Sequence, residues 1–352
     1  MSLLSSSPQK PTSPDVRLAQ LIGWLDALGL VQADSRRPAS SDASFRRYFR
    51  LDVLPELQDK LGATLIAMDA PPERENVPAF IHVAGLLLEA GVNVPAIVAR
   101  DVPNGFLLLS DLGTTTYLQR LNADNAAFMY SDAVDALIKF QLHSQPGVLP
   151  EFDRAFVMRE INLFPEWFVA QHLGVTMSAE QKAQLDAVFD TIAANVLSQQ
   201  QVFMHRDFHS RNLMFMERDN PGVLDFQDAV FGPVTYDLAS LLRDAYIQWD
   251  EEIVLDWVVR YWQSAKKAGL PVNPDIDAFY RDFEFMALQR HLKILGIFCR
   301  LNYRDGKSIY MGDLPTVLDY VRKTANRYSS LKPLVRLLDA FEDKAPQVGY
   351  TF

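Results

Sequence analysis

One short stretch of the chain combines residues whose types and spacing could do chemistry. Asn212 follows Asp207 by five positions, and Asp225 comes after a polar turn flanked by the apolar runs 213–216 and 223–226. Two such runs about a turn are typical of a hairpin. Folding there brings Asn212 within about one residue of Asp225 across the ladder. Oxygen ligands from two strands suit Mg²⁺, and a nearby aspartate can accept a proton.

Each of these side chains alone could simply cap backbone groups in a turn. Together they predict phosphoryl transfer, in which Asp207 takes the proton of an attacking hydroxyl while Asn212 and Asp225 hold Mg²⁺ against nucleotide phosphates. The segment also fits H-R-D-x-x-x-x-N, a kinase catalytic-loop pattern. We therefore expect ATP and Mg²⁺ as cofactors.

The elements that must position these residues fall into two groups. The 352 residues are enough for two lobes. Residues 15–110 predict a small β-rich N-lobe, and residues 111–352 predict a larger helical C-lobe with the catalytic loop and acceptor site. The fold class is then α+β, a two-lobed fold with a hinge near 110–113, and residues 1–14 form a flexible tail. The expected N-lobe elements are a helix over 18–28, strands over 45–51 and 64–68, a helix over 79–90 and a hairpin over 97–109.

Composition excludes several classes of protein. Hydrophobic residues make up 49% and charged residues 22%, typical of a well-cored globule. The net charge of −10 argues against a nucleic-acid partner. Cys299 is the only cysteine, so an internal disulfide is impossible. Because there is neither a long apolar run nor a signal-peptide pattern, we expect no membrane partner and a cytoplasmic location.

The catalytic segment resembles a known family. H-x-D-x-H-x-x-N at 205–212 and Y-D-L-A at 236–239 are similar to the aminoglycoside phosphotransferase and choline kinase group of the protein-kinase-like fold. The resemblance implies that Asp207 is the base and that Asn212 and Asp225 bind the metal. It implies a structural hydrogen-bonding role for His205, and Asp237 is expected to brace the loop.

A narrower resemblance concerns the acceptor. SSDASFRRYFR, MDAPPE, FPEWF and LDFQDAVFGPVTYDLASLLRDAY together resemble the bacterial anomeric sugar kinases of cell-wall recycling, over residues 15–340. That family phosphorylates N-acetylmuramate and N-acetylglucosamine at C1, which implies an amino-sugar substrate and a place in peptidoglycan recycling. The alternatives are a phosphotransferase acting on an aminoglycoside, choline or another small alcohol, and an inactive nucleotide-binding scaffold.

Two segments are expected to meet the nucleotide. Small residues at 41–44 can let the backbone approach phosphate although the loop has no glycine. Where kinases carry a strand-three lysine this chain has Met68-Asp69, so Arg46 or Arg47 could supply the missing cation. Arginines on a solvated strand are the alternative. The predicted nucleotide contacts are Ser41, Ala43, Ser44, Phe45 and Arg47, with Asp111 and Gly113 at the hinge near the adenine.

A row of basic residues provides information about which acceptor the protein uses. Arg290, Lys293, Arg300 and Arg304 recur near one helical face. Such a stripe could read the lactyl carboxylate of N-acetylmuramate, or it could be a solvated face. Trp167 could stack on a sugar ring or be a buried aromatic. The predicted substrate contacts are His209, Arg211, Trp167, Arg290 and Arg300.

Overall fold

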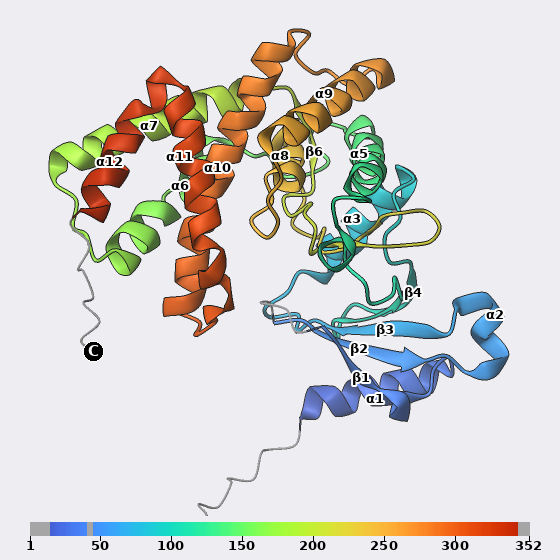
Figure 1. Ribbon diagram of the computed structural model, residues 1–352. Helices are drawn as coiled ribbons and strands as arrows, with labels where there is room; N and C mark the ends of the chain where they lie inside the picture. The colour runs from blue at the N-terminus through green and yellow to red at the C-terminus, as the bar shows by residue number, and fades with distance from the viewer. Residues whose placement is uncertain (1–14, 41–44, 344–352) are drawn as a thin grey trace, which may run out of the picture. The chain divides into compact units, whose positions relative to one another are not determined.

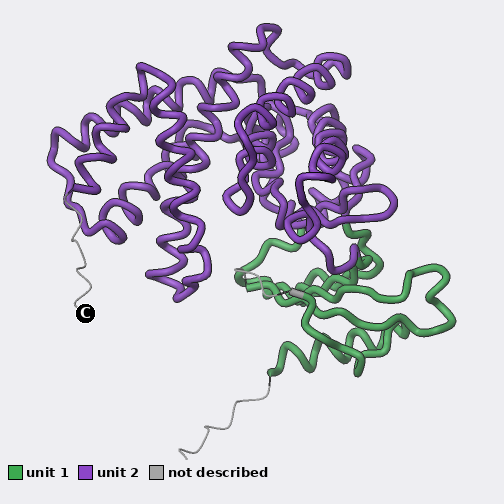
Figure 2. The backbone as a smooth tube through the Cα atoms, viewed as in Figure 1, with its two compact units in different colours: residues 1–78, 95–111 green, residues 79–94, 112–352 purple. Residues whose placement is uncertain are grey.

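The computed structural model describes residues 15–40 and 45–343, so the predicted contacts Ser41, Ala43 and Ser44 lie outside the described residues. The chain divides into two compact units, residues 1–78 with 95–111 and residues 79–94 with 112–352 (Figure 2). The division places the end of unit 1 at Asp111, one residue beyond the predicted boundary, and it assigns the segment 79–94, expected in the N-lobe, to unit 2. This segment belongs to unit 2 because Phe80 packs on Phe226 at 4.7 Å and the Val223 N–H donates to the Asn93 carbonyl at 2.8 Å.

Unit 1 is built on an antiparallel sheet. Its strand order is β1-β2-β3-β5-β4, and helix α1 (Val16–Leu28) covers one face (Figure 1). Leu21 and Leu25 of α1 pack with alternate strand residues such as Leu65 and Ala67, as the two-residue period of a strand requires. The strands are β1 (Arg37–Ser40), β2 (Arg47–Asp52), β3 (Thr64–Asp69), β4 (Ile97–Asp101) and β5 (Phe106–Ser110), and the short helices are η1 (Ala33–Ser35), η2 (Pro55–Leu57) and α2 (Gln58–Leu61).

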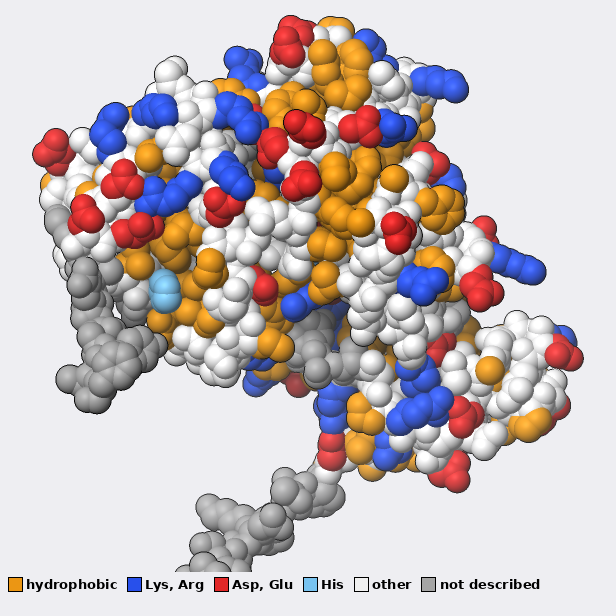
Figure 3. Space-filling view, viewed as in Figure 1, with side chains coloured by type: hydrophobic (Ala, Val, Ile, Leu, Met, Phe, Trp, Pro, Cys, Tyr) orange, Lys and Arg blue, Asp and Glu red, His pale blue; other side chains and the backbone are white. Residues whose placement is uncertain are grey.

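Unit 2 is mostly helical and is organised around α10 (Ile276–Tyr303). This helix packs against α7 (Ala179–Ser198), α8 (Tyr236–Leu242), α11 (Leu314–Arg327) and the π-helix η3 (Phe164–His172), and Figure 1 shows its course through the unit. Most of its residues are buried. A Cβ added at Gly296 would lie 2.3 Å from the Leu163 carbonyl oxygen, so glycine permits the close approach of α10 to η3. Acidic and basic side chains are interspersed over the visible face of this unit (Figure 3).

The remaining helices of unit 2 are shorter than α10. No helix among residues 15–40 and 45–343 has the length and low charge needed to cross a membrane. The other helices are α3 (Val77–Glu89, which begins in unit 1), α4 (Tyr117–Arg120), α5 (Ala126–Leu142), α6 (Arg154–Ile161), α7 (Ala179–Ser198), α8 (Tyr236–Leu242), α9 (Glu251–Ala268), η4 (Ser308–Asp313), α11 (Leu314–Arg327), η5 (Ser329–Leu331) and α12 (Lys332–Glu342).

Two small ladders in unit 2 carry the catalytic segment. Strand β6 (Gln201–Met204) pairs with β9 (Val230–Pro233), and β7 (Leu213–Met214) pairs with β8 (Gly222–Val223). The loop 205–212 connects β6 to β7. The predicted hairpin is confirmed, because Leu213 lies opposite Val223. The α+β fold class is also confirmed, whereas the sequence pattern did not predict β9 or the π-helical turns at 164–172.

Candidate active site

The loop 205–212 is clasped at its start by a carboxylate from α8. Asp237 accepts the backbone N–H groups of His205 at 2.6 Å and Arg206 at 2.9 Å. Burial raises the pKa of Asp237 to about 7, although these two donors oppose the rise. The clasp holds Arg206 at a left-handed φ of 79°, a backbone conformation that needs such support. Asp237 braces the loop, as the sequence predicted.

His205 connects the loop to the hairpin. Its Nε2 lies 2.9 Å from the Leu224 carbonyl oxygen, and its Nδ1 accepts the Asp207 N–H at 3.2 Å. The proton therefore sits on Nε2. Burial lowers the pKa of His205 to about 4, so the ring is neutral near pH 7. This is the structural hydrogen-bonding role predicted for it.

The side chain of Asp207 is left open by its surroundings. Its backbone carbonyl accepts the His209 N–H and the Asn212 amide, each at 3.0 Å, but no donor among the described residues reaches its carboxylate. Burial alone would raise the pKa of Asp207, but the neighbouring positive charges, Lys293 foremost, lower it below its ordinary value. Asp207 is therefore an ionised acceptor that is free to bond a hydroxyl.

Those positive charges come largely from α10 and are buried. Arg290 is 5% exposed, donates from Nη1 to the Arg206 carbonyl at 2.7 Å, and stacks on Tyr236 at 4.6 Å. Lys293 pairs with Glu160 at 2.9 Å, as does Arg206 at 2.8 Å. The prediction of a solvated face is wrong for Arg290 and Lys293. The Arg290 guanidinium bonds the backbone of the catalytic loop and so braces it, and the contact of Arg290 with the acceptor stays a prediction.

Asn212 and Asp225 lie together across the hairpin. The Leu224 N–H donates to the Asn212 carbonyl at 2.9 Å, which places Asp225 one residue further along. The side-chain amide nitrogen of Asn212 lies 3.0 Å from the Asp207 carbonyl and 3.5 Å from Asp225 Oδ2. Because that nitrogen faces the loop, Asn212 Oδ1 remains as an acceptor that no donor in the described part of the chain occupies. Asp225 has a φ of 61° and accepts from Gln227 at 2.9 Å.

This pair fits Mg²⁺ better than a metal held by many protein groups. Mg²⁺ binds through one or two carboxylate or amide oxygens together with phosphates and water. Within residues 15–40 and 45–343, no three His, Cys, Asp or Glu side chains gather into a cage that could hold a metal. The donor set of Asn212 and Asp225 is therefore sufficient for Mg²⁺ only when a nucleotide supplies further oxygens.

A second brace was missed from the sequence. Asp244 is 3% exposed, and its Oδ2 accepts the Ser210 N–H at 3.0 Å and the Ser210 hydroxyl at 2.5 Å. Its Oδ1 accepts the Tyr246 N–H at 3.1 Å. The Tyr246 ring lies 3.6 Å beneath the Arg211 guanidinium and 5.5 Å from the His209 ring. The signal in the sequence that could have indicated this brace is the D-A-Y segment at 244–246. Its aspartate is the first acidic residue after α8.

Two predicted substrate residues lie elsewhere in unit 2. Trp167 is half-buried in the π-helix η3. Arg300 is half-buried near the end of α10, and its Nε has no acceptor among the described residues. Burial lowers the pKa of Arg300, and nearby Arg304 adds to the effect. Both substrate roles stay predictions.

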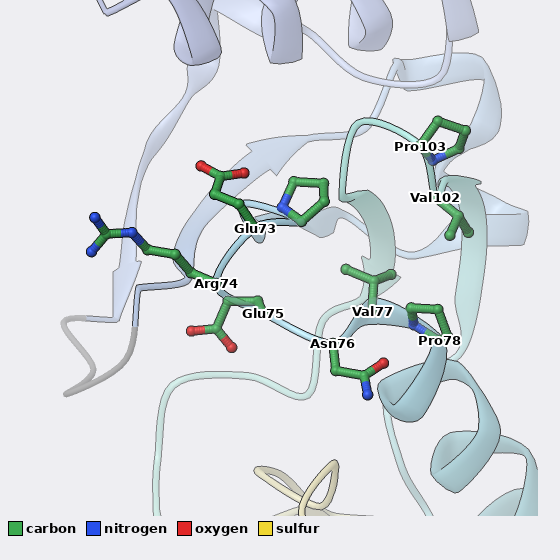
Figure 4. Close-up of a pocket in the computed structure, with 9 residues that line it drawn as sticks. Glu73, Arg74, Glu75, Asn76, Val77, Pro78, Val102 and Pro103 are labelled. Carbon is green, nitrogen blue, oxygen red and sulfur yellow. The ribbon is translucent and has the colours of Figure 1, made fainter.

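In unit 1, the end of the predicted nucleotide loop is attached to the segment after β3. The Phe45 N–H donates to Glu75 at 3.0 Å, and Arg46 lies 3.5 Å from the same carboxylate. Glu75 also lines a pocket of about 600 Å³, where Glu73, Arg74 and Glu75 lie to one side of Val77, Pro78 and Val102 (Figure 4). None of the predicted catalytic residues lines it.

The other predicted nucleotide residues of unit 1 are held by ion pairs. Arg47 pairs with Asp15 and with the fully buried Asp69. The Asp111 carboxylate accepts from Arg50 at 2.5 and 2.9 Å and from Thr64 at 2.7 Å. The Arg47 and Asp111 side chains therefore brace the sheet. In unit 2, Gly113 is exposed and takes a φ of 87°.

Most of this chain is similar in sequence to known proteins. The phosphotransferase enzyme family matches residues 35–271. The chain is 46% identical over 334 residues to N-acetylmuramate/N-acetylglucosamine kinase of Pseudomonas putida, covering 92% of this chain and 96% of that protein. It is 44% identical over 341 residues to the protein of the same name from Neisseria meningitidis, covering 96% and 99%.

Among solved structures, the chain resembles a choline/ethanolamine kinase family protein from Mesorhizobium loti. The TM-score is 0.60 at 14% identity, and the match covers 94% of this chain and 99% of that one. At 14% sequence identity the similarity is evidence for the fold alone, and it confirms the predicted protein-kinase-like architecture. Because the family model matches residues 35–271, more than half of the chain, the chain belongs to the phosphotransferase enzyme family.

Proposed function

We propose that this chain is an ATP-dependent kinase that phosphorylates the C1 hydroxyl of N-acetylmuramate and N-acetylglucosamine. The observation that carries the proposal is the open Asp207 carboxylate beside the Asn212–Asp225 pair. Two relatives among those that bear this kinase name match nearly the whole chain at 46% and 44% identity, which supports the choice of acceptor. An inactive scaffold would have no need of an unbonded, ionised aspartate at this place.

Mg²⁺ would be held by Asn212 Oδ1 and the Asp225 carboxylate. When bound, it would neutralise charge on the nucleotide phosphates. Contacts of the loop 41–45 with phosphate and of the backbone from Asp111 to Gly113 with the adenine stay predictions. Arg47 enters this proposal as the residue that secures β2 to Asp69.

The chain's own residues prepare the acceptor hydroxyl. The ionised Asp207 accepts the hydrogen bond of the C1 hydroxyl and orients that group. It takes the proton as the C1 oxygen bonds to the γ-phosphorus of ATP and the bond from that phosphorus to the departing ADP breaks. The hydroxyl at C1 of a reducing sugar is a hemiacetal and more acidic than an ordinary alcohol, so a base of lowered pKa is adequate. Lys293 and Arg290 help keep Asp207 ionised, and Asp237 holds the backbone that carries it.

Such a reaction would return sugars of the cell wall to metabolism, and its need for ATP agrees with a cytoplasmic setting. A panel of free amino sugars, hexoses, choline and aminoglycosides, assayed by ADP release with phosphorus NMR of the product, tests the proposal. We expect turnover of the two N-acetyl sugars and none of their methyl glycosides, whose C1 oxygen is capped. Phosphorylation of a methyl glycoside would move the reaction to another hydroxyl, and preferred turnover of choline or an aminoglycoside would replace the proposed acceptor.

A further inference from the structure

Arg211 is a cation without a matching anion beside the catalytic aspartate. Its guanidinium lies 3.6 Å from the centre of the Tyr246 ring and 5.7 Å from that of Tyr310. No hydrogen bond or ion pair joins it to any residue that the structure describes. A guanidinium whose face rests on aromatic rings keeps its N–H edges available for a planar anion.

The other cations near the loop are already occupied. Arg206 pairs with Glu160, and Arg290 donates to the Arg206 carbonyl. Burial raises the pKa of Asp313, at the end of η4, and Arg211 is near enough to oppose that rise, yet the two side chains form no ion pair. Arg211 therefore differs from Arg206 and Arg290 in that its guanidinium is available to bind a ligand.

The aromatic support beneath Arg211 is rigidly built. Phe298 of α10 packs against Tyr246 at 6.1 Å and against Tyr310 at 5.2 Å. Asp244 bonds both the Tyr246 N–H and Ser210 of the catalytic loop. The support and the loop thus share one buried carboxylate, so the position of the guanidinium is tied to that of the loop.

This position adjoins the reacting groups. Arg211 immediately precedes Asn212, whose amide nitrogen lies 3.0 Å from the backbone oxygen of Asp207. Burial raises the pKa of Tyr246, the ring beneath Arg211, and the nearby charge of Asp207 adds to that rise, so a ligand at Arg211 lies in the neighbourhood of the Asp207 carboxylate.

We propose that Arg211, supported by Tyr246 and Tyr310, binds the lactyl carboxylate of N-acetylmuramate and so determines the preference for acidic over neutral amino sugars. This inference rests on the proposed function and names the group of the acceptor that the site reads. A guanidinium can bond a carboxylate through two parallel N–H groups, and this geometry suits a short acidic substituent on a sugar ring. Arg300 is the rival reader, because its Nε also has no acceptor in the described part of the chain.

The test compares variants on three acceptors: N-acetylmuramate, its neutral methyl ester, and N-acetylglucosamine. Arg211→Gln should lower kcat/KM for the acid by about 10- to 150-fold, the effect of losing a charged hydrogen bond, and change it by less than about threefold for the two neutral acceptors. Arg211→Lys retains the positive charge but lacks the two parallel N–H groups of a guanidinium, so its kcat/KM for the acid should fall by less than that of Arg211→Gln. Arg260→Gln, in an exposed arginine of α9 that pairs with Asp256, is the matched control.

Two outcomes would overturn the inference. Equal losses on all three acceptors would mean that Arg211 serves phosphoryl transfer or loop structure. An acid-specific loss in Arg300→Gln but not in Arg211→Gln would move the carboxylate site to α10. Calorimetric binding of N-acetylmuramate to wild type and Arg211→Gln separates this inference from the proposed function. Arg211-dependent binding without turnover contradicts only the kinase assignment, and turnover of both sugars without an Arg211 effect contradicts only the role given to Arg211.

Discussion

The catalytic loop of unit 2 and the strand ends of unit 1 both gather charged side chains, but they use them differently. On the loop, Asp237 and Arg290 bond the backbone, so the Asp207 carboxylate is left open. At the strand ends, Arg17 and Arg47 both bond Asp69. Charges that bond the backbone hold a loop in place while reactive side chains remain available, whereas charges that bond each other neutralise themselves.

The two regions use their charges differently because they bury different polar groups. A loop with a left-handed residue exposes backbone N–H groups that need acceptors, and Asp237 supplies them. Asp69 is fully buried at the end of β3 and requires counter-charges, because an unpaired buried carboxylate is strongly destabilising. The following predictions test whether the first region serves chemistry and the second serves stability.

The largest effect is expected at the open carboxylate. Asp207→Asn keeps the shape but removes the proton acceptor, so kcat should fall by about 10²–10⁴ with little loss of nucleotide binding. Steady-state kinetics and nucleotide titration measure both quantities. Asp256→Asn, which alters an exposed carboxylate paired with Arg260, is the control. Near-normal turnover in Asp207→Asn would remove this residue from the chemistry.

The next effect concerns the metal pair. Asp225→Ala should weaken Mg²⁺ binding in the presence of ADP by about 10²-fold or more, because a charged ligand is lost. Asn212→Ala should weaken it less, because its amide oxygen is neutral. Calorimetric titration of Mg²⁺ gives the ranking, with Asp228→Ala as a control for an exposed carboxylate nearby. Wild-type affinity in both variants would contradict the assignment.

The third prediction addresses the strand ends of unit 1. Asp69→Asn leaves Arg17 and Arg47 without their shared buried counter-charge, so the free energy of unfolding should fall by about 3 kcal/mol. Asp52→Asn, which breaks an exposed pair with Arg37, should cost at most about 1 kcal/mol. Urea unfolding measures both. If Asp69→Asn instead reduced kcat as strongly as Asp207→Asn at unchanged stability, the contrast between the two regions would be wrong.

The smallest effect is a pH dependence of stability in unit 2. Burial lowers the pKa of His291 to about 3, and its Nε2 lies 2.9 Å from the Arg243 carbonyl oxygen. Between this value and the ordinary histidine pKa, the unfolded chain binds the proton and the folded chain does not. Stability is therefore complete above about pH 6.5 and should fall with acidification by about 1 kcal/mol over the first pH unit.

Thermal unfolding of wild type and His291→Gln between pH 7.5 and 5 isolates this contribution, since glutamine does not titrate. The stability advantage of wild type over the variant should shrink as the pH falls. An advantage that stays constant would mean that the folded protein does not disfavour protonated His291.

The residues of the stretch 205–225 were sufficient to predict the hairpin and the approach of Asn212 to Asp225. The register of a hairpin follows from its turn, and Leu213 does lie opposite Val223. The strand-rich first part and the helical remainder also followed from the hydrophobic period together with the turn-forming residues between the elements. These features are local, because each depends on residues within one or two elements.

The choice of partners was decided only by the tertiary structure. Arg290 reaches a carbonyl 84 positions away, Asp244 bonds a serine 34 positions before it, and Arg47 meets Asp69 across 22 positions. Similar arginines thus became a buried brace at 290, a paired strand end at 47 and an open cation at 211. The residue type determines that a side chain is charged. The role of that charge depends on whether the fold brings another charge or a backbone group within hydrogen-bond distance, and no local sequence pattern encodes this.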